Sequence, residues 1–211
     1  MKEISPLSNI EKNGLFGNYQ NKGEDKLIII NEVTNIKVYQ LVKFKSSSLE
    51  STLISIDDQI LPISPNSVNG NKVTRILWNA PNTWLIISSD RDISKKITDN
   101  CSENDFAITN LSHSKVVLQI QGEQALDVIK KGSPLNLNNF KKNDCRTSVY
   151  HGITFTIDMV EDTQIILNLM ASRSFSDSFY HAITDSALEL SLIHISEPTR
   201  PLYISYAVFC L

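Results

Sequence analysis

Arg146–Met170, RTSVYHGITFTIDMVEDTQIILNLM, contains three successive apolar-rich segments that decide the fold class. The segments are Arg146–Tyr150, Ile153–Val160 and Thr163–Met170. His151-Gly152 and Glu161-Asp162 separate them, and two residues are enough only for a tight turn. In the middle segment the apolar side chains alternate, with one face formed by Ile153, Phe155, Ile157 and Met159. This period of two predicts three antiparallel strands with one buried face.

Strands and helices are expected on both sides of this stretch. Further strands are expected at Leu27–Val33, Asn35–Phe44, Val73–Trp78, Trp84–Ser88, Phe106–Asn110 and Lys115–Gln121. Helices are expected over 49–56 after the Ser46–Ser48 hydroxyls, over Ile93–Thr98 with Asp92 as cap, over Glu123–Lys131 with Gly132 as left-handed cap, and from Ser174 onward. Helices separated by short runs of strands indicate an α+β class, in which antiparallel strands carry helices packed on the sheet faces.

The chain is expected to divide into three parts. Residues 1–26 are polar and predict a mobile N-terminal arm. Residues 27–189 are expected to form one α+β domain, because no linker rich in Pro, Gly or Ser divides them. Residues 190–211 resemble a translated sequencing adapter followed by a flow-cell primer, so the natural chain is expected to stop near Glu189.

Composition and charge exclude several classes of protein. The formal net charge of −3 comes from nearly balanced charges, which argues against a nucleic-acid partner. No apolar run reaches the roughly 20 residues that a membrane helix needs, and the N-terminus lacks the apolar core of a signal peptide. A cytoplasmic protein is therefore expected. The three cysteines, Cys101, Cys145 and Cys210, form no CxxC pair, so neither a zinc site nor a disulfide framework is expected.

No motif for a cofactor or for catalysis emerges from the residues. The chain has neither the glycine-rich turn that binds a dinucleotide nor a Walker loop. Its histidines are dispersed, and His113 between two serines is interpreted as part of a polar bend rather than as a base. We therefore expect no catalytic, cofactor-binding or metal-ligating residue on this chain.

Two tryptophans and two arginines are the residues that the sequence singles out. Trp78 and Trp84 flank a proline turn, and they are candidates for a subunit interface. The core is the alternative for both, and it is favoured for Trp78. Arg146 and Arg173 lie at element boundaries and are structural candidates, each expected to hold loop ends together through an internal pair.

Five segments between Val33 and Ala187 resemble, in order, motifs of the gamma subunit of heterotetrameric sarcosine oxidase. The segments are Leu77–Ile86, Leu111–Ala125, Lys131–Leu137, Cys145–Thr147 and Ala171–Phe175. They are similar to the aromatic–Gly–Pro–Asp–Glu–Trp–Leu segment, the Asp-x-Ser to Gly-x-x-Ala stretch, Gly-Cys-Pro-Leu-Asp-Leu, Arg-Thr and Val-x-Arg-Ser-Phe/Tyr. Asn79 and Ala80 stand where glycine is usual, and Asn136 stands where aspartate is usual.

This resemblance implies a fold similar to the aminomethyltransferase, or folate-binding, fold of the glycine cleavage T-protein. It also implies a complex with alpha, beta and delta subunits that demethylates sarcosine to glycine and transfers the one-carbon unit to tetrahydrofolate. In that family FAD, FMN, NAD, tetrahydrofolate and zinc are held by the partner subunits, so no cofactor is expected here. The leading hypothesis is a non-catalytic subunit with an assembly role in an oxidoreductase complex. The alternative is a stand-alone folate-binding or aminomethyltransferase-like module.

Overall fold

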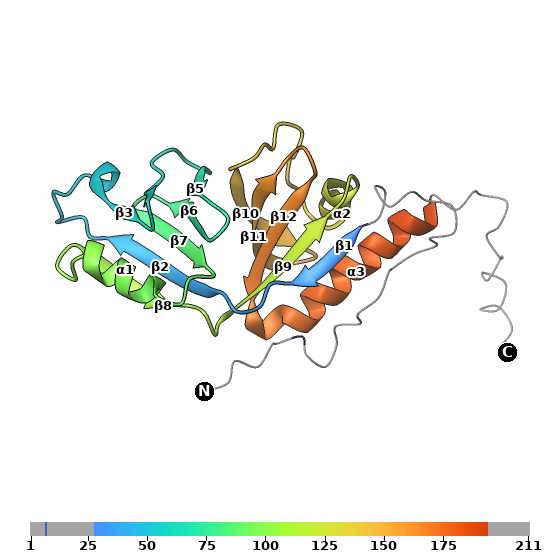
Figure 1. The fold of residues 1–211 in the computed structure, drawn as a ribbon. Helices are drawn as coiled ribbons and strands as arrows, with labels where there is room; N and C mark the ends of the chain where they lie inside the picture. The colour runs from blue at the N-terminus through green and yellow to red at the C-terminus, as the bar shows by residue number, and fades with distance from the viewer. Residues whose placement is uncertain (1–6, 8–27, 194–211) are drawn as a thin grey trace, which may run out of the picture.

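A computed structural model describes residue 7 and residues 28–193, in which two five-stranded antiparallel sheets form the framework (Figure 1). Sheet A has the strand order β1-β9-β12-β11-β10, and sheet B has the order β5-β6-β7-β2-β8. The strands of sheet A are β1 (Ile29–Glu32), β9 (Lys115–Gln121), β10 (Cys145–Tyr150), β11 (Ile153–Glu161) and β12 (Ile166–Ser172). The strands of sheet B are β2 (Lys37–Lys43), β5 (Val68–Gly70), β6 (Thr74–Ala80), β7 (Thr83–Ser88) and β8 (Phe106–Asn110). A small hairpin adds β3 (Ser55–Ile56) and β4 (Gln59–Ile60).

The chain enters sheet A, builds all of sheet B, and then returns to sheet A. β1 pairs with β9, with Ile30 opposite Ile120, so these two strands are neighbours in sheet A. All strands of sheet B lie between them in the sequence. The two crossings, from β1 to β2 and from β8 to β9, lie on the same side of the molecule (Figure 1). Each sheet and its helices form one lobe, and the two lobes share these crossings.

Helices cover one face of each sheet, as expected for the α+β class. α2 (Ala125–Gly132) and α3 (Ser176–Ile193) pack on sheet A, and α1 (Ile93–Asn100) packs on sheet B. The core under α3 contains the predicted strand face Phe155, Ile157 and Met159. From the helix it contains Phe179, Ile183 and Ala187, which lie four residues apart on one stripe. None of the helices in the described ranges has the length and apolar character needed to cross a membrane.

Some sequence expectations fail at the ends of helices. The helix expected over 49–56 is absent, and the chain forms a 3₁₀ turn at Ser51–Leu53 followed by β3. Phe175 belongs to a 3₁₀ turn, Arg173–Phe175, that precedes α3, so it is half-exposed and outside the stripe. At α1 the backbone N–H of Asp92 donates to Asp90 Oδ1 at 2.9 Å, so Asp90 and not Asp92 supplies the side-chain oxygen. These ends depend on turn geometry that apolar spacing does not encode.

The expected arm and tail lie mostly outside the described residues. Leu7 is the one described residue of the segment 1–26, and it is fully buried in the core of sheet A. Of the segment 190–211, the described part 190–193 continues α3. The three-part division of the chain stays a prediction.

Gly132 ends α2 by close packing and not by a left-handed conformation. A Cβ at this position would lie 2.6 Å from Cζ of Tyr150 and 2.7 Å from Cδ2 of His151. Tyr150 is held in place, because its hydroxyl donates to Val128 O at 3.0 Å and lies 2.7 Å from Ser186 Oγ. The glycine is required here because the helix end lies directly on the ring.

We expect Gly132→Ala to lower the free energy of unfolding by about 1–3 kcal/mol, the usual cost of overfilling a packed core. Urea unfolding followed by far-ultraviolet circular dichroism measures this loss. Lys130→Ala, on the exposed side of the same helix, is the control and is expected to leave the midpoint unchanged. Equal midpoints for both variants would show that the ring can move away from the helix.

Candidate functional site

The faces of the two sheets that turn away from the helices meet in a buried seam. Its apolar part joins side chains of both sheets, namely Val38, Val68, Leu77, Leu85 and Ile87 from sheet B and Val117, Cys145 and Met170 from sheet A. Two backbone hydrogen bonds cross the seam, from Val68 N to Asn143 O at 2.8 Å and from Cys145 N to Asn66 O at 2.8 Å. The lobes are therefore joined by packing and by backbone pairing as well as by the chain crossings.

A buried ion pair, Arg75–Asp158, lies across the same seam. Arg75 Nε donates to Asp158 Oδ2 at 2.6 Å and Nη2 donates to Oδ1 at 2.7 Å, a bidentate arrangement. The side chains are 11% and 2% exposed. Burial raises the pKa of the Asp158 carboxyl, and the hydrogen bonds and charge of Arg75 oppose that shift. The pair ties β6 of one lobe to β11 of the other, and it leaves no carboxylate oxygen open to a ligand.

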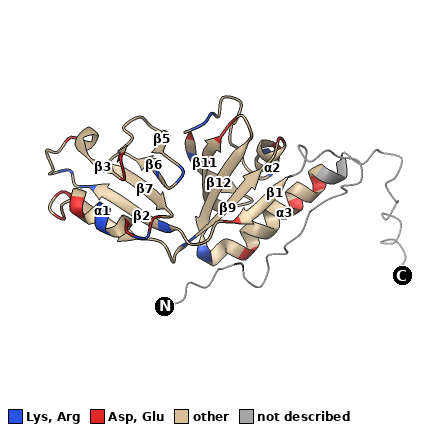
Figure 2. Ribbon diagram, in the orientation of Figure 1, with Lys and Arg blue, Asp and Glu red and all other residues tan. Residues whose placement is uncertain are grey.

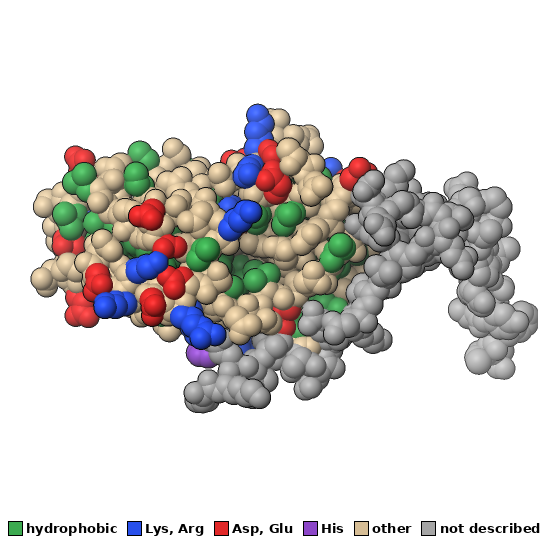
Figure 3. Space-filling view, in the orientation of Figure 1, with side chains coloured by type: hydrophobic (Ala, Val, Ile, Leu, Met, Phe, Trp, Pro, Cys, Tyr) green, Lys and Arg blue, Asp and Glu red, His purple; other side chains and the backbone are tan. Residues whose placement is uncertain are grey.

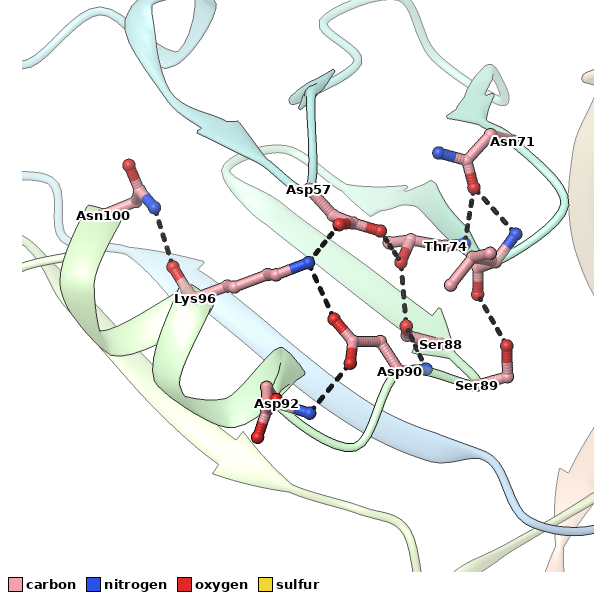
Figure 4. Close-up of polar contacts among 10 residues, drawn as sticks. Asp57, Asn71, Thr74, Ser88, Ser89, Asp90, Asp92, Lys96 and Asn100 are labelled. Atoms are coloured by element: carbon pink, nitrogen blue, oxygen red, sulfur yellow. Dashed lines mark hydrogen bonds and ion pairs between the residues drawn. The ribbon is translucent and has the colours of Figure 1, made fainter.

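A second polar network surrounds Lys96 on α1 (Figure 4). Its ammonium group pairs with Asp57 of the β3–β4 turn and with Asp90, whose Oδ2 lies 2.7 Å away. Thr74 Oγ1 donates to Asp57 Oδ2 at 2.6 Å and lies 2.8 Å from Ser88 Oγ. Both carboxylates raise the pKa of Lys96, so the amine stays protonated and cannot serve as a base. Lys96 also lowers the pKa of Asp57 and Asp90, and the network therefore joins α1, the hairpin and two strands.

The histidines and cysteines of the described residues are not brought together. His113 lies in the turn between β8 and β9, His151 lies in the turn after β10, and His181 pairs with Asp177 on the surface of α3. Burial raises the pKa of Cys101 to about 11 and that of Cys145 to about 12, so both thiols stay protonated near neutral pH. Within residues 28–193 no three such side chains are grouped as metal ligands would be.

The two tryptophans lie opposite each other on β6 and β7, on the face toward α1. Trp84 is 2% exposed, and its Nε1 donates to Pro62 O at 2.7 Å. Trp84 therefore belongs to the core of sheet B and presents no surface in this conformation. Trp78 is half-buried, so of the two interface candidates it is the one with accessible surface.

Arg146 and Arg173 differ in their surroundings. Arg146, on β10, has no ion pair with any described residue, although an internal pair was expected, and its Cζ lies 5.8 Å from the centre of the Phe140 ring. Its Nε is buried and has no hydrogen-bond partner. A hollow of about 390 Å³ beside it is lined by Asn136, Asn139 and Arg146. The backbone N–H of Arg173 donates to Ser114 O at 2.9 Å and so anchors the turn before α3.

Charged residues in the described part of the chain are distributed over both lobes without a cluster of one sign (Figure 2). On the face shown in Figure 3, acidic and basic side chains are interspersed and apolar ones lie between them. This distribution agrees with a net charge of only −3. Large exposed apolar side chains are frequent between the 3₁₀ turn Ser51–Leu53 and β6, where Leu53 is 74% and Ile63 is 63% exposed.

One surface carboxylate is expected to titrate far below its ordinary range. The pKa of Glu161 is lowered from 4.5 to about 2, chiefly by Lys142, whose Nζ lies 2.7 Å from Oε2, and then by Thr163. Because the folded-state pKa is lowered, the stabilisation is present above pH 4.5 and is lost as the pH falls toward 2.

We expect Lys142→Met to raise the pKa of Glu161 toward 4.5, because it removes the largest cause of the shift. A carbon-13 titration of the side-chain carboxyl group in both proteins measures the change. Lys95→Met, on α1 of the other lobe, should leave the Glu161 titration as it is. An unchanged pKa in Lys142→Met would mean that Thr163 and the backbone hold the carboxylate alone.

The fold of the chain is similar to those of known proteins. No protein-family model and no curated protein matches the chain. Among solved structures, the chain is similar to heterotetrameric sarcosine oxidase from Corynebacterium sp. U-96 in complex with pyrrole 2-carboxylate. The TM-score is 0.72 at 20% identity, over 80% of this chain and 88% of that chain. It is also similar to glycine cleavage system aminomethyltransferase T from Bartonella henselae, with a TM-score of 0.54 at 12% identity.

The second match covers 76% of this chain but 46% of the aminomethyltransferase, so the chain spans under half of that protein's length. The chain therefore has an α+β fold like that of aminomethyltransferases and folate-binding proteins, and this confirms the expected fold class and the expected structural neighbours.

Sequence reasoning missed Arg75 and Asp158. The available signal was a charged residue flanked by apolar ones in each of two strands, Asp158 between Ile157 and Met159 and Arg75 before Ile76 and Leu77.

Proposed function

We propose that the chain is a non-catalytic subunit of a heterotetrameric oxidase of the sarcosine oxidase kind, with a role in assembly. The observation that carries this proposal is the similarity to a chain of such an oxidase over most of both chains. Because 80% of this chain corresponds to 88% of the matched one, the two are of comparable length. The match is thus to a small chain of that complex taken nearly whole, and not to one domain of a much larger one.

The surface of the lobe built on sheet B supports an assembly role. Four large apolar side chains between residues 53 and 73 are strongly exposed, namely Leu53, Ile60, Ile63 and Val73. These side chains lie within one stretch of 21 residues of the same lobe, and exposed apolar surface is typical of a region that another protein covers. We propose that this region, together with Trp78, contacts a larger partner chain. In this proposal the partners are alpha, beta and delta subunits that hold FAD, FMN, NAD, tetrahydrofolate and zinc, and the complex is cytoplasmic.

Co-expression tests the proposal. The chain, with an N-terminal tag, is co-expressed with candidate alpha, beta and delta subunits and purified through the tag. Recovery of a yellow complex with all four chains is expected. A chain that ends at Glu189 is expected to recover the same complex, because we propose that residues 27–189 form the functional unit.

Surface variants separate specific assembly from general stickiness. Leu53→Ser and Ile63→Ser are expected to reduce recovery of the partner chains, because both side chains lie in the exposed apolar region. Phe175→Ser is the matched control, since Phe175 is 52% exposed but lies on the other lobe. Equal recovery for all three variants would place the interface elsewhere.

The second candidate is a stand-alone folate-binding or aminomethyltransferase-like module, and the similarity to aminomethyltransferase T favours it. It predicts a colourless monomer that binds tetrahydrofolate tightly and recovers no flavin-containing chain. Fluorescence titration with tetrahydrofolate on the purified chain decides between the two. Tight binding by the isolated monomer would overturn the subunit proposal.

A further inference from the structure

We propose that the hollow beside Arg146 binds a carboxylate group, with the guanidinium group as its ion-pair partner and the Asn136 and Asn139 side chains as polar neighbours. The hollow has a volume of about 390 Å³. It is formed by the start of β10 and by the loop that connects α2 to β10. This site is separate from the apolar surface of the other lobe, on which the assembly role rests.

The first argument is the missing partner of Arg146. Its Nε is buried and has no hydrogen-bond acceptor, and the guanidinium group has no ion pair within residues 28–193. A buried donor without an acceptor is costly. By contrast, Arg75 donates two hydrogen bonds to the carboxylate of Asp158. A ligand that supplies acceptors would remove the deficit at Arg146.

The second argument is that the guanidinium group is held in position before any ligand arrives. Its Cζ lies 5.8 Å from the centre of the Phe140 ring, and Phe140 is itself buried in the core of sheet A. A cation–π contact with an aromatic ring favours one position of the guanidinium group without using its N–H donors. The ring contact uses none of the guanidinium N–H donors, and Nε still has no acceptor in the described part of the chain.

The third argument is the polarity of the remaining lining. Asn136 Oδ1 already accepts the backbone N–H of Asn138 at 3.1 Å, which leaves the Asn136 amide NH₂ as a donor. Asn139 brings a second side-chain amide to the same wall. Among the described residues, a lining of one guanidinium and two amides suits a planar group that carries two acceptor oxygens.

Charge favours a carboxylate over a phosphate. Among the described residues that line the hollow, Arg146 is the one with a positive charge, and no lysine is among them. One positive charge balances a carboxylate, whereas a phosphate dianion would need further cations. The volume lies at the small end of the range for ligand pockets, about 300–1,000 Å³. It therefore suits a small organic acid or the acidic side chain of another chain.

Nuclear magnetic resonance of the arginine side chains tests the proposal on the full chain. The sequence has five arginines, so the Nε–Hε signals are few, and Arg146→Lys assigns the one that disappears. Sodium succinate is titrated against sodium chloride at equal ionic strength, and inorganic phosphate is titrated separately. A saturable shift of the Arg146 signal is expected with succinate. Arg91→Lys, in the loop before α1, is the control variant.

Thermal unfolding gives the second readout. Succinate is expected to raise the melting temperature of the unchanged chain and of Arg91→Lys, because a ligand stabilises the state that it binds. In Arg146→Lys the apparent affinity is expected to fall roughly tenfold or more, because lysine replaces a planar fork by a point charge.

The two sources of the carboxylate give different results. A saturable succinate shift identifies a small acid. No succinate shift, combined with loss of partner recovery in Arg146→Lys but not in Arg91→Lys, identifies an acidic side chain of a partner, and this second source rests on the proposed function. If the unchanged chain recovers no partner, the proposed function fails while the succinate titration still decides this proposal. Neither response, or a tighter response to phosphate, would overturn it.

Discussion

Replacement of Asp158 by asparagine is expected to lower the free energy of unfolding by about 3–5 kcal/mol, the usual cost of removing one partner from a buried ion pair. The carboxylate is 2% exposed, and both of its oxygens accept hydrogen bonds from Arg75. In the variant the guanidinium charge stays in the seam between the sheets without a counter-charge. Its other partners, Asn143 Oδ1 and Met159 O, lie farther away, both at 3.3 Å.

Urea unfolding at pH 7, followed by fluorescence and by circular dichroism, measures this loss. The matched control is Asp127→Asn, which removes the same charge from the exposed Asp127–Lys130 pair and is expected to leave the midpoint unchanged. The double variant Arg75→Met/Asp158→Leu should recover much of the loss, because it leaves no unpaired charge in the seam. A loss from Asp158→Asn no larger than that of the control would show that water reaches the pair.

Most strands could be predicted from the sequence, because alternation and turn residues act locally. β8 and β9 have the bounds that the sequence predicted, and His151-Gly152 forms the expected tight turn, with φ of 45° and 85°. In β11 the apolar face predicted from alternation is the one buried under α3. These features depend on neighbours within a few residues, so a single sequence contains them.

The segment 49–56 shows where local reasoning fails. Leu49, Leu53 and Ile56 have helical spacing, yet Leu53 is exposed and Ile56 is buried in the core of sheet B. Asp57 and Asp58 both adopt positive φ, 53° and 62°, which a helix cannot continue into. Asp57 is held there by Lys96 and Thr74, which are distant in the sequence. The tertiary contacts of the turn therefore override the spacing.

The seam and the Arg146 hollow could not be predicted for a related reason. Arg75 and Asp158 are 83 residues apart, and only the relative placement of the two sheets brings them together. Arg146 was expected to have an internal partner on the basis of its boundary position. That position alone does not show which groups surround a side chain. Positions are local information, whereas the partners of a buried charge depend on the complete fold.

Trp84→Ala is expected to be as damaging as Asp158→Asn, with a loss of about 3–5 kcal/mol in the free energy of unfolding. Trp84 is 2% exposed and belongs to the core between sheet B and α1, so truncation leaves a large cavity. Trp84→Phe separates volume from hydrogen bonding. It keeps a ring but leaves the buried Pro62 carbonyl without the indole N–H, at an expected cost of about 1–3 kcal/mol.

Trp78→Ala is the matched comparison, because Trp78 lies opposite Trp84 on the same sheet face but is only half-buried. We expect it to cost less stability than Trp84→Ala and, as an interface candidate, to reduce recovery of partner chains in the co-expression experiment. Trp84→Phe should leave that recovery unchanged. Urea unfolding and tag purification of the three variants measure both effects. If Trp84→Ala kept full stability but lost the partners, Trp84 would have to leave the core when the complex forms.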